Sequence, residues 1–359
     1  MLNKLFLFLL SPFNVWTPLE SSAPDQLGLE VISTSTDQLA VQPPNNPTIE
    51  DAAPWTSPQP SCMVKQLYQF ESNLTRLENL AVRPNGQLVL NVVTKPIIYG
   101  YNPSKPNSDS NPKKLHTFTN VTSVLGIDEI TPDVFAVVVG NFSDVGHHEP
   151  GTFSIWSVDL KKSKPNVTLI TAIPEAQALN GLSTINGTEP MILIADSVDG
   201  VLWRVVPRTK EYIKIFDSPL LSNTTVKNIG VNGIRTFQQK LYFINSGQAT
   251  YGRVPLHQNA TAAGEVEILA RVQGIGKWDD LDIDWEGNAW VATHRGDLTE
   301  ITLEGRQRTT KACEGVKMLD PTSARFGRGS KKEQKTLYVV TAGNSDGPGQ
   351  VVAADTCQM

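Results

Sequence analysis

The stretch WDDLDIDWEGNAWVATH at 278–294 contains a short strand, a Glu-Gly-Asn turn and a second, strongly apolar strand. Apolar and polar side chains alternate before the turn, as is typical of a strand with one buried face. The first strand carries two neighbouring carboxylates, Asp279 and Asp280, which repel each other unless water or a positive group stabilises them. The stretch therefore predicts a β-hairpin and raises the question of what balances its charge.

Five further segments repeat this strand, turn, strand pattern along the chain. They are LENLAVRPNGQLVLNVV at 77–93, VLGIDEITPDVFAVVVGN at 124–141, LNGLSTINGTEPMILIADS at 179–197, VNGIRTFQQKLYFINSG at 231–247 and PTSARFGRGSKKEQKTLYVVTAG at 321–343. Successive segments start 43 to 55 residues apart, a spacing expected of four-stranded propeller blades. Weaker strand patterns lie between them, and helical periodicity is almost absent. The sequence predicts an all-β fold, a six-bladed β-propeller with four-stranded blades.

The ends of the domain, predicted at 62–359, are expected to close the ring. A strand near 350–354 would pair with an early strand near 63–68. The three cysteines allow one disulfide and leave one thiol. A Cys62–Cys357 bridge would fit the closure, while Cys313–Cys357 and three unpaired buried thiols are the alternatives.

The N-terminal region has the composition of a targeting and leader segment. Residues 1–23 combine one Lys, a short apolar run and small residues, as in a secretory signal peptide, and the run is too short to span a membrane. Residues 24–61 are rich in Pro, Ser, Thr and Gln, which predicts a mostly disordered leader. Secretion is also favoured by the Asn-x-Ser/Thr sequons at Asn73, Asn120, Asn141, Asn166, Asn186, Asn223 and Asn259.

Composition and motifs exclude several functions. The 359-residue chain has a net charge of −5 and 40% hydrophobic residues, enough for a sizeable core. This acidic balance argues against nucleic acid as a partner, since KKSK at 161–164 is more typical of a solvated turn. The chain has no G-x-S-x-G, H-E-x-x-H, phosphate-loop or dinucleotide motif, so no organic cofactor is predicted.

The repeat predicts a ring of side chains at one mouth of the central channel. If the first strand of each segment is innermost, one equivalent position per blade lies at this mouth, here called the mouth ring. Its members are Glu78, Leu125, Asn180, Asn232, Asp279 and Thr322. Four of these carry carboxylate or amide oxygens, Glu78, Asn180, Asn232 and Asp279, which suit a hard divalent cation, most naturally Ca²⁺, and not zinc or copper. The alternative is that Asn-Gly and Asp-Asp are ordinary turn residues.

The second strand of each hairpin returns to the same mouth and brings further candidates. Lys95, the loops 140–151 and 245–253, and Arg295 are expected there, together with the histidines His147, His148 and His294. Such a face supplies general acids or bases and pocket walls. His294 is the strongest individual candidate because an apolar strand fixes its position, although a loop histidine is more often simply solvated.

The segments LNGLSTINGTEPMILIADSVDGVLWRV, WDDLDIDWEGNAWVAT and PTSARFGRGSKKEQKTLYVVTA resemble the gluconolactonase, regucalcin and paraoxonase lineage of six-bladed propellers. The resemblance covers roughly 64–355. In that lineage a Glu, Asn residues and an Asp hold a divalent ion that polarises a lactone or ester carbonyl. The resemblance assigns these roles to Glu78, Asn180, Asn232 and Asp279.

Within this superfamily the chain is most similar to fungal hetero-Diels-Alderases of tropolone–sesquiterpenoid biosynthesis. The resemblance implies loss of water from a hydroxymethyl tropolone, giving a quinone methide that adds to an alkene of a humulene-type macrocycle. His294, Tyr251 or a loop residue such as His147 would help the hydroxyl leave. Substrate contacts are expected from Lys95, Asn141, Phe142, Val145, His148 and Arg295.

We therefore predict a hetero-Diels-Alderase of meroterpenoid secondary metabolism that acts on small-molecule substrates, with a metal-dependent lactonase as the alternative. A secreted propeller that only binds a ligand at its mouth is the third hypothesis. The geometric prediction common to all three is that Asp279 and His294 face one pocket.

Overall fold

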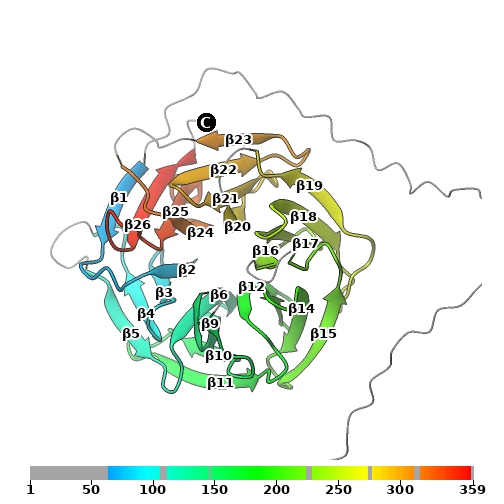
Figure 1. Cartoon of the computed structure of the whole chain (residues 1–359). Helices are drawn as coiled ribbons and strands as arrows, with labels where there is room; N and C mark the ends of the chain where they lie inside the picture. The colour runs from blue at the N-terminus through cyan, green and yellow to red at the C-terminus, as the bar shows by residue number, and fades with distance from the viewer. Residues whose placement is uncertain are drawn as a thin grey trace, which may run out of the picture. The chain divides into compact units, whose positions relative to one another are not determined.

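The computed structural model describes residues 64–105, 111–144, 147–223, 229–273, 277–310 and 316–356. Six four-stranded antiparallel sheets are arranged around a central channel (Figure 1). The only helix among the described residues is a single turn of 3-10 helix, η1 (Glu333–Lys335). The predicted six-bladed β-propeller is confirmed.

Each blade runs from an innermost strand at the channel to an outermost strand at the rim. Blade one contains β2 (Leu77–Val82), β3 (Leu88–Val92), β4 (Ile97–Tyr101) and β5 (Lys113–Thr117). Blade two contains β6 (Ser123–Thr131), β7 (Val134–Gly140), β10 (Ser154–Asp159) and β11 (Asn166–Ala172), with the small hairpin β8 (Phe142–Asp144) and β9 (His147–His148) inserted after β7. Blade three contains β12 (Leu179–Ile185), β13 (Met191–Asp196), β14 (Val201–Val206) and β15 (Glu211–Asp217).

The last three blades follow the same order. Blade four contains β16 (Val231–Phe237), β17 (Lys240–Asn245), β18 (Thr250–Pro255) and β19 (Glu267–Arg271). Blade five contains β20 (Trp278–Ile283), β21 (Ala289–Thr293), β22 (Asp297–Ile301) and β23 (Gln307–Thr310). Blade six contains β24 (Pro321–Phe326), β25 (Thr336–Thr341), β26 (Gln350–Asp355) and, as its outermost strand, β1 (Val64–Gln69).

Blade six closes the ring by joining both ends of the described chain. Strand β1 pairs antiparallel with β26 from Val64 opposite Ala354 to Gln69 opposite Gln350. This confirms the predicted pairing of an early strand with the last one. The three cysteines lie outside the described residues, as do the predicted signal peptide and leader, so both disulfide alternatives and the two N-terminal segments stay predictions.

The innermost strands carry a β-bulge where the sequence places the mouth ring. The register shifts between Leu77 and Leu80 in blade one, and at the equivalent point of the other innermost strands. A bulge bends a strand and re-aims a side chain. The residues inside the bulge, such as Asp279 and Asp280, can therefore turn toward the channel while their neighbours stay in the core.

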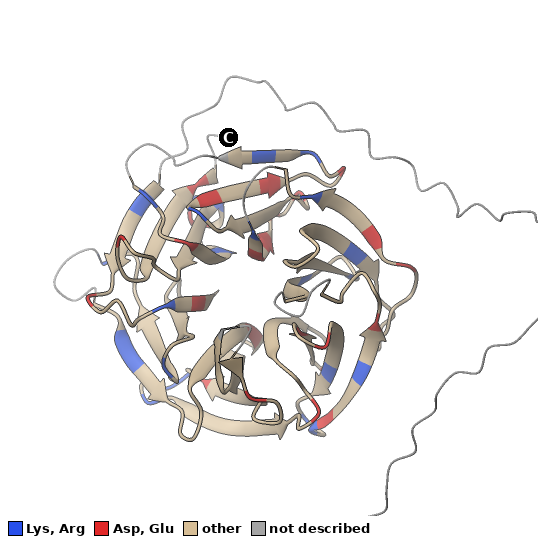
Figure 2. Cartoon of the chain, viewed as in Figure 1, with Lys and Arg blue, Asp and Glu red and all other residues tan. Residues whose placement is uncertain are grey.

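The core is formed by apolar side chains that the blades pack against one another. The central strand β21 is buried along its whole length, and Leu281 and Val291 belong to a cluster that includes residues of blade four. No helix in the described part of the chain is long and apolar enough to cross a membrane. Lys, Arg, Asp and Glu residues lie on the outer strands and also at the inner ends of β2 and β20, near the channel (Figure 2).

Candidate functional site

A cavity of about 230 Å³ lies at the mouth of the channel to which the sequence assigned the ring. Five of the six mouth-ring residues line it, Leu125 being buried in the core instead. The complete lining, here called the mouth cavity, is Arg76, Glu78, Val93, Phe142, Ser143, Asn180, Ile229, Asn232, Ser246, Gly247, Lys277, Asp279, His294, Thr322 and Ala342. The oxygen-bearing residues predicted from four different blades therefore share one cavity.

One backbone hydrogen bond recurs from blade to blade and aligns the walls of the mouth cavity. In each of these blades the acceptor is the carbonyl of the residue two places before the mouth-ring residue. The donor is the N–H of the residue just after the second strand. The pairs are Val93 to Arg76 (3.0 Å), Ser197 to Ala178 (2.9 Å), Ser246 to Gly230 (3.1 Å), His294 to Lys277 (2.9 Å) and Ala342 to Asp320 (2.8 Å). His294 thus lies where blades one and six have Val93 and Ala342.

His294 bridges two carboxylates. Its Nε2 lies 3.1 Å from Oδ2 of Asp279, and its Nδ1 lies 2.9 Å from Oδ1 of Asp320. Burial lowers the pKa of His294, but the hydrogen bonds to these carboxylates outweigh it and raise the pKa to about 10. The imidazole is therefore protonated at neutral pH. The prediction that Asp279 and His294 face one pocket is confirmed.

Asp279 is stabilised by the protein itself. Besides the contact with His294, its Oδ1 accepts a hydrogen bond from Nδ2 of Asn232 at 2.5 Å. The same amide group donates to Oγ of Ser246 at 3.1 Å, and that hydroxyl donates to the carbonyl of Trp278 at 2.7 Å. The charge of Asp279 is thus balanced by an imidazolium and an amide.

Glu78 is the other carboxyl group of the mouth cavity, and its surroundings favour the protonated form. Burial, and next the nearby charge of Asp279, raise the pKa of Glu78 to about 8, while His294 acts in the opposite direction. Glu78 makes no hydrogen bond or ion pair to any residue that the structure describes. It is consequently a neutral acid below about pH 8 with a proton to donate.

Two of the four oxygen-bearing side chains keep uncommitted oxygen atoms of the kind that the predicted Ca²⁺ ion would need. Oδ1 of Asn180 is buried and has no hydrogen-bond partner among the described residues, and Glu78 is likewise uncommitted. An orphaned carbonyl oxygen beside carboxylates is suited to a hard cation. Over the described ranges, no group of three or more His, Cys, Asp or Glu side chains is arranged for a metal, so amide oxygens would have to take part.

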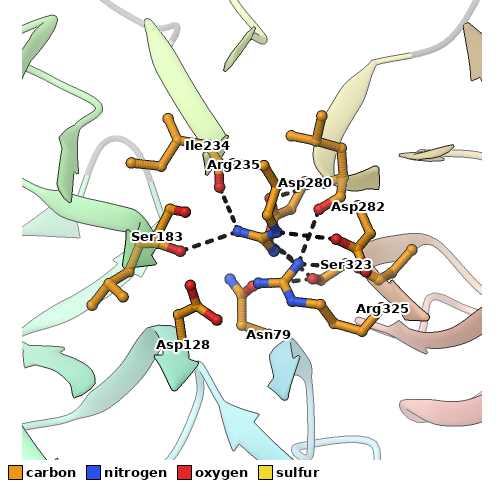
Figure 3. A network of polar contacts seen from close by, with 12 residues as sticks. Asn79, Asp128, Ser183, Ile234, Arg235, Asp280, Asp282, Ser323 and Arg325 are labelled. Atoms are coloured by element: carbon orange, nitrogen blue, oxygen red, sulfur yellow. Dashed lines mark hydrogen bonds and ion pairs between the residues drawn. The ribbon is translucent and has the colours of Figure 1, made fainter. Parts of the chain in front are cut away.

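Below the mouth cavity a buried network of charged groups fills the channel (Figure 3). Asp280 Oδ2 lies 3.2 Å from Arg235 Nη2, 3.6 Å from Arg325 Nη1 and 3.0 Å from Ser323 Oγ. Arg235 Nε lies 3.7 Å from Oδ1 of Asp282. Burial raises the pKa of Asp280 to about 6 although Arg235 lowers it. The side chains of the Asp279–Asp280 pair are therefore separated, one facing the cavity and the other serving as an internal counter-ion.

A second cavity of about 230 Å³ lies beyond this network, and it shares no lining residue with the mouth cavity. Arg235, Asp282 and Arg325 line it, together with Arg328, which pairs with Glu129. The charges at this second cavity thus have partners within the protein.

Tyr251 does not belong to the site, and its prediction as a catalytic residue is corrected. The sequence predicts a loop at 245–253, but Thr250–Pro255 is strand β18. The Tyr251 ring is 1% exposed and stacks on Tyr242, with centroids 5.9 Å apart, in the core between blades four and five. Burial raises its pKa well above 10, so Tyr251 is a neutral core residue.

Five other residues that the sequence predicts for the site lie outside the lining of the mouth cavity: Lys95, Asn141, His147, His148 and Arg295. Lys95 lies beyond the end of β3, and its Nζ donates to Oγ1 of Thr75 at 3.2 Å. Arg295 is exposed in a turn with φ of 85°. In the segment that follows β7, Asn141 donates through Nδ2 to Oε2 of Glu149 at 2.7 Å.

The hairpin of β8 and β9 reaches the cavity with one of its two strands. His147 is exposed and His148 is half-buried on β9, and both make contacts of their own, but neither lines the cavity. Phe142 on β8 does line it, as predicted. Val145 lies outside the described residues. The loop 140–151 therefore supplies an aromatic wall and not a histidine.

Three charged residues were missed by reasoning from the sequence alone: Arg76, Lys277 and Asp320. Arg76 and Lys277 line the mouth cavity, and Asp320 holds His294. All three lie two places before the mouth ring, in blades one, five and six. Because strand side chains repeat with period 2, this position faces the same side as the ring and could have been identified from the alignment of the segments.

The predicted glycosylation sites differ in exposure. Asn73, Asn120, Asn166, Asn186 and Asn259 are exposed. Asn141 and Asn223 are half-buried, and each uses its amide group internally, the latter with Nδ2 at 3.3 Å from the carbonyl of Val198. Glycosylation of these asparagines requires the secretory route and stays a prediction. The exposed asparagines are the most accessible to it.

Comparison with known proteins gives curated relatives that cover about three quarters of the chain. The chain is 27% identical over 303 residues to a Sarocladium schorii protein provisionally named hetero-Diels-Alderase asR5, covering 74% of this chain and 75% of the relative. It is 26% identical over 299 residues to a Phoma sp. protein provisionally named a hetero-Diels-Alderase, covering 74% and 83%. Regucalcin, a calcium-binding protein from Agrobacterium tumefaciens, has the same fold at 15% identity, with a TM-score of 0.57 and coverage of 81% and 93%. No family model matches the chain. The resemblance inferred from the sequence is confirmed.

Proposed function

We propose that the protein is a hetero-Diels-Alderase of fungal secondary metabolism. It would convert a hydroxymethyl tropolone into a quinone methide and guide the addition of this species to an alkene of a humulene-type macrocycle. Two curated relatives with provisional names of this kind support the proposal. The mouth cavity supports it further, since it combines acidic, basic and apolar walls.

The reaction has two steps. In the first, the ring hydroxyl gives up its proton to solvent, the bond between carbon and the hydroxymethyl oxygen breaks, and the hydroxyl takes up one proton and leaves as water. In the second, the exocyclic carbon and the ring oxygen of the quinone methide form bonds to the two alkene carbons. The protein has to supply a proton to the first step and a fixed geometry to the second.

The observation that carries the proposal is the position of Glu78, whose carboxyl group lines the mouth cavity without a hydrogen bond or ion pair to any described side chain. Its raised pKa of about 8 keeps it protonated at neutral pH, and no described side chain takes up its proton. A carboxylic acid held neutral in this way is suited to protonate a leaving hydroxyl. His294 is less suited, because both of its ring nitrogens are engaged by Asp279 and Asp320. We therefore assign the role of proton donor to Glu78. His294 has the role of holding Asp279 in place.

The size of the cavity fits one ring and not both partners. Its volume of about 230 Å³ is below the range of roughly 300–1,000 Å³ that is typical of pockets for drug-sized ligands. The tropolone would fill it, and the macrocycle would lie over the rim near Phe142 and Ile229, the apolar residues on that side. Holding two reactants in a reactive pose can lower a barrier by several kcal/mol, up to about 7–11.

The test is to incubate purified protein with a hydroxymethyl tropolone precursor and humulenol and to measure the adduct by mass spectrometry. We expect adduct formation above the rate in buffer, and a loss of about 10²–10⁴-fold in Glu78→Gln. The control is Glu286→Gln in an exposed turn, which should react like the wild type. Adduct formation that is unaffected by Glu78→Gln would refute the assignment of the acid.

A metal-dependent lactonase is the second candidate, favoured by the orphaned Oδ1 of Asn180. Ca²⁺ would be held by Glu78, Asn180, Asn232 and Asp279, and when bound it would polarise a lactone carbonyl. Glu78 would then be a carboxylate and not an acid, which separates the two candidates. Lactone hydrolysis that stops with a chelator, without adduct formation, would favour this second candidate. Reaction with neither substrate would favour a propeller that only binds a ligand.

A further inference from the structure

Two cationic side chains line the mouth cavity without a partner among the residues that the structure describes. Arg76 and Lys277 are exposed residues at the rim. Neither side chain makes a hydrogen bond or ion pair with any residue in the described part of the chain. This distinguishes them from the other arginines near the channel, which are engaged with carboxylates or backbone carbonyls.

Backbone hydrogen bonds fix the positions of Arg76 and Lys277. The carbonyl of Arg76 accepts a hydrogen bond from the N–H of Val93 at 3.0 Å, and its own N–H donates to Oγ1 of Thr94 at 3.1 Å. The carbonyl of Lys277 accepts one from the N–H of His294 at 2.9 Å. Both residues therefore extend from ordered strand ends in blades one and five, on either side of blade six.

The neighbouring carboxylates make their direct contacts with other groups, and Arg76 acts on them only at longer range, where its charge lowers the pKa of Glu78 and of Asp320. Asp320 occupies the equivalent position of blade six, and its carboxylate is held by Nδ1 of His294 and the N–H of Arg295 (2.9 and 3.3 Å). Asp279 is held by Nε2 of the same histidine and by Asn232. The carboxylates of this wall are thus engaged with other groups, and the rim presents two available positive charges.

We propose that Arg76 and Lys277 bind the anionic oxygen edge of the substrate, an acidic ring with two adjacent oxygens. This inference rests on the proposed function and names the chemistry that recognises the tropolone partner. A guanidinium presents two parallel N–H donors, which match a pair of adjacent oxygens, and an ammonium adds a point charge. Tropolone, a vinylogous carboxylic acid, offers such a pair, whereas a macrocycle with a single hydroxyl offers none.

The proposal predicts how the protein distinguishes the tropolone from the macrocycle. The oxygen edge would be held at the rim between blades one and five, and the apolar macrocycle would gain nothing from this part of the cavity. Because both cations are exposed, their attraction for an anion should weaken as salt is added. A ligand of the same shape that cannot ionise should lose most of the interaction.

The experiment is a binding titration of the full chain with unsubstituted tropolone, followed by its absorbance, and with its methyl ether, 2-methoxytropone. We expect tropolone to bind at least about tenfold more tightly than the ether, and Arg76→Gln and Lys277→Gln each to weaken tropolone binding by about tenfold. Lys113→Gln, an exposed lysine on β5, is the matched control and should bind like the wild type. Unchanged thermal unfolding would show that the variants are folded.

The outcomes separate this inference from the proposed function. Absence of tropolone binding, equal binding of tropolone and its ether, or binding that neither variant weakens would overturn the inference, even if the wild type forms the cycloadduct. If tropolone binds through the two cations but no adduct forms with the natural precursor, the inference stands and the proposed function fails.

Discussion

Replacing Asp320 by Asn tests the arrangement around His294 directly. The substitution removes one of the two carboxylates that flank the imidazole, and keeps an oxygen that can accept the hydrogen bond from Nδ1. The carboxylate of Asp279, 3.1 Å from Nε2, remains. The change is therefore mainly one of charge, at a position where both side chains are about 30% exposed.

The expected magnitude follows from the distance between the groups. An opposite charge within about 4–6 Å shifts a pKa by about 1–3 units, so the pKa of His294 should fall from about 10 by that amount in the variant. Each unit corresponds to about 1.4 kcal/mol. Because the folded pKa lies above the unfolded value of 6.5, the stabilisation is complete below about pH 6.5 and is lost as the pH rises through 10. The variant should thus be less stable than the wild type by about 1–4 kcal/mol at pH 6.

Two measurements check this. An NMR titration of the His294 ring gives its pKa in both proteins, and urea unfolding between pH 6 and pH 10 gives the free energies of unfolding. The difference in stability should shrink toward pH 10. Asp199→Asn, which loses an exposed pair with Lys214, is the control and should show no such trend. A His294 pKa that moves by less than about half a unit would refute the reasoning.

Three further predictions concern the channel and the core. Arg235→Met removes one of the two arginines that flank the buried Asp280, leaving Arg325 at 3.6 Å, and should cost about 1–3 kcal/mol in urea unfolding, whereas Arg208→Met, in an exposed pair, should cost at most about 1. Gly233→Ala places a methyl group 2.5 Å from Cα of Asp280 and should lower the thermal unfolding midpoint by more than Gly187→Ala, which meets nothing within 4 Å. Tyr251→Phe should leave adduct formation unchanged, because the ring lies in the core.

The sequence was sufficient to predict the propeller and most of the mouth ring, for a physical reason. Six segments with one pattern impose one backbone path, and a side-chain period of 2 then assigns each position to a face. Five of the six ring residues line the cavity as a result. Leu125 is the exception, because an apolar side chain at this position turns into the core.

The residues predicted to follow the second strand of each hairpin show the limit of this reasoning. Lys95 and Arg295 lie three and two residues beyond the ends of β3 and β21, respectively, where the chain has already turned away from the cavity that Val93 and His294 line. Tyr251 is predicted in the loop 245–253, yet the chain re-enters a strand at Thr250. Strand ends depend on hydrogen bonds between strands, which a single segment does not encode.

The two ends of the channel contain similar residue types, and the pairing of their charges decides which end binds a ligand. At the second cavity Arg328 pairs with Glu129, and Arg235 and Arg325 share Asp280, so a ligand would have to break existing ion pairs. At the mouth cavity Arg76, Lys277 and Glu78 have no partner among the described residues. A ligand that contacts them breaks no ion pair among the described residues. Binding is therefore favoured at the mouth cavity, where the chain keeps its charged groups available.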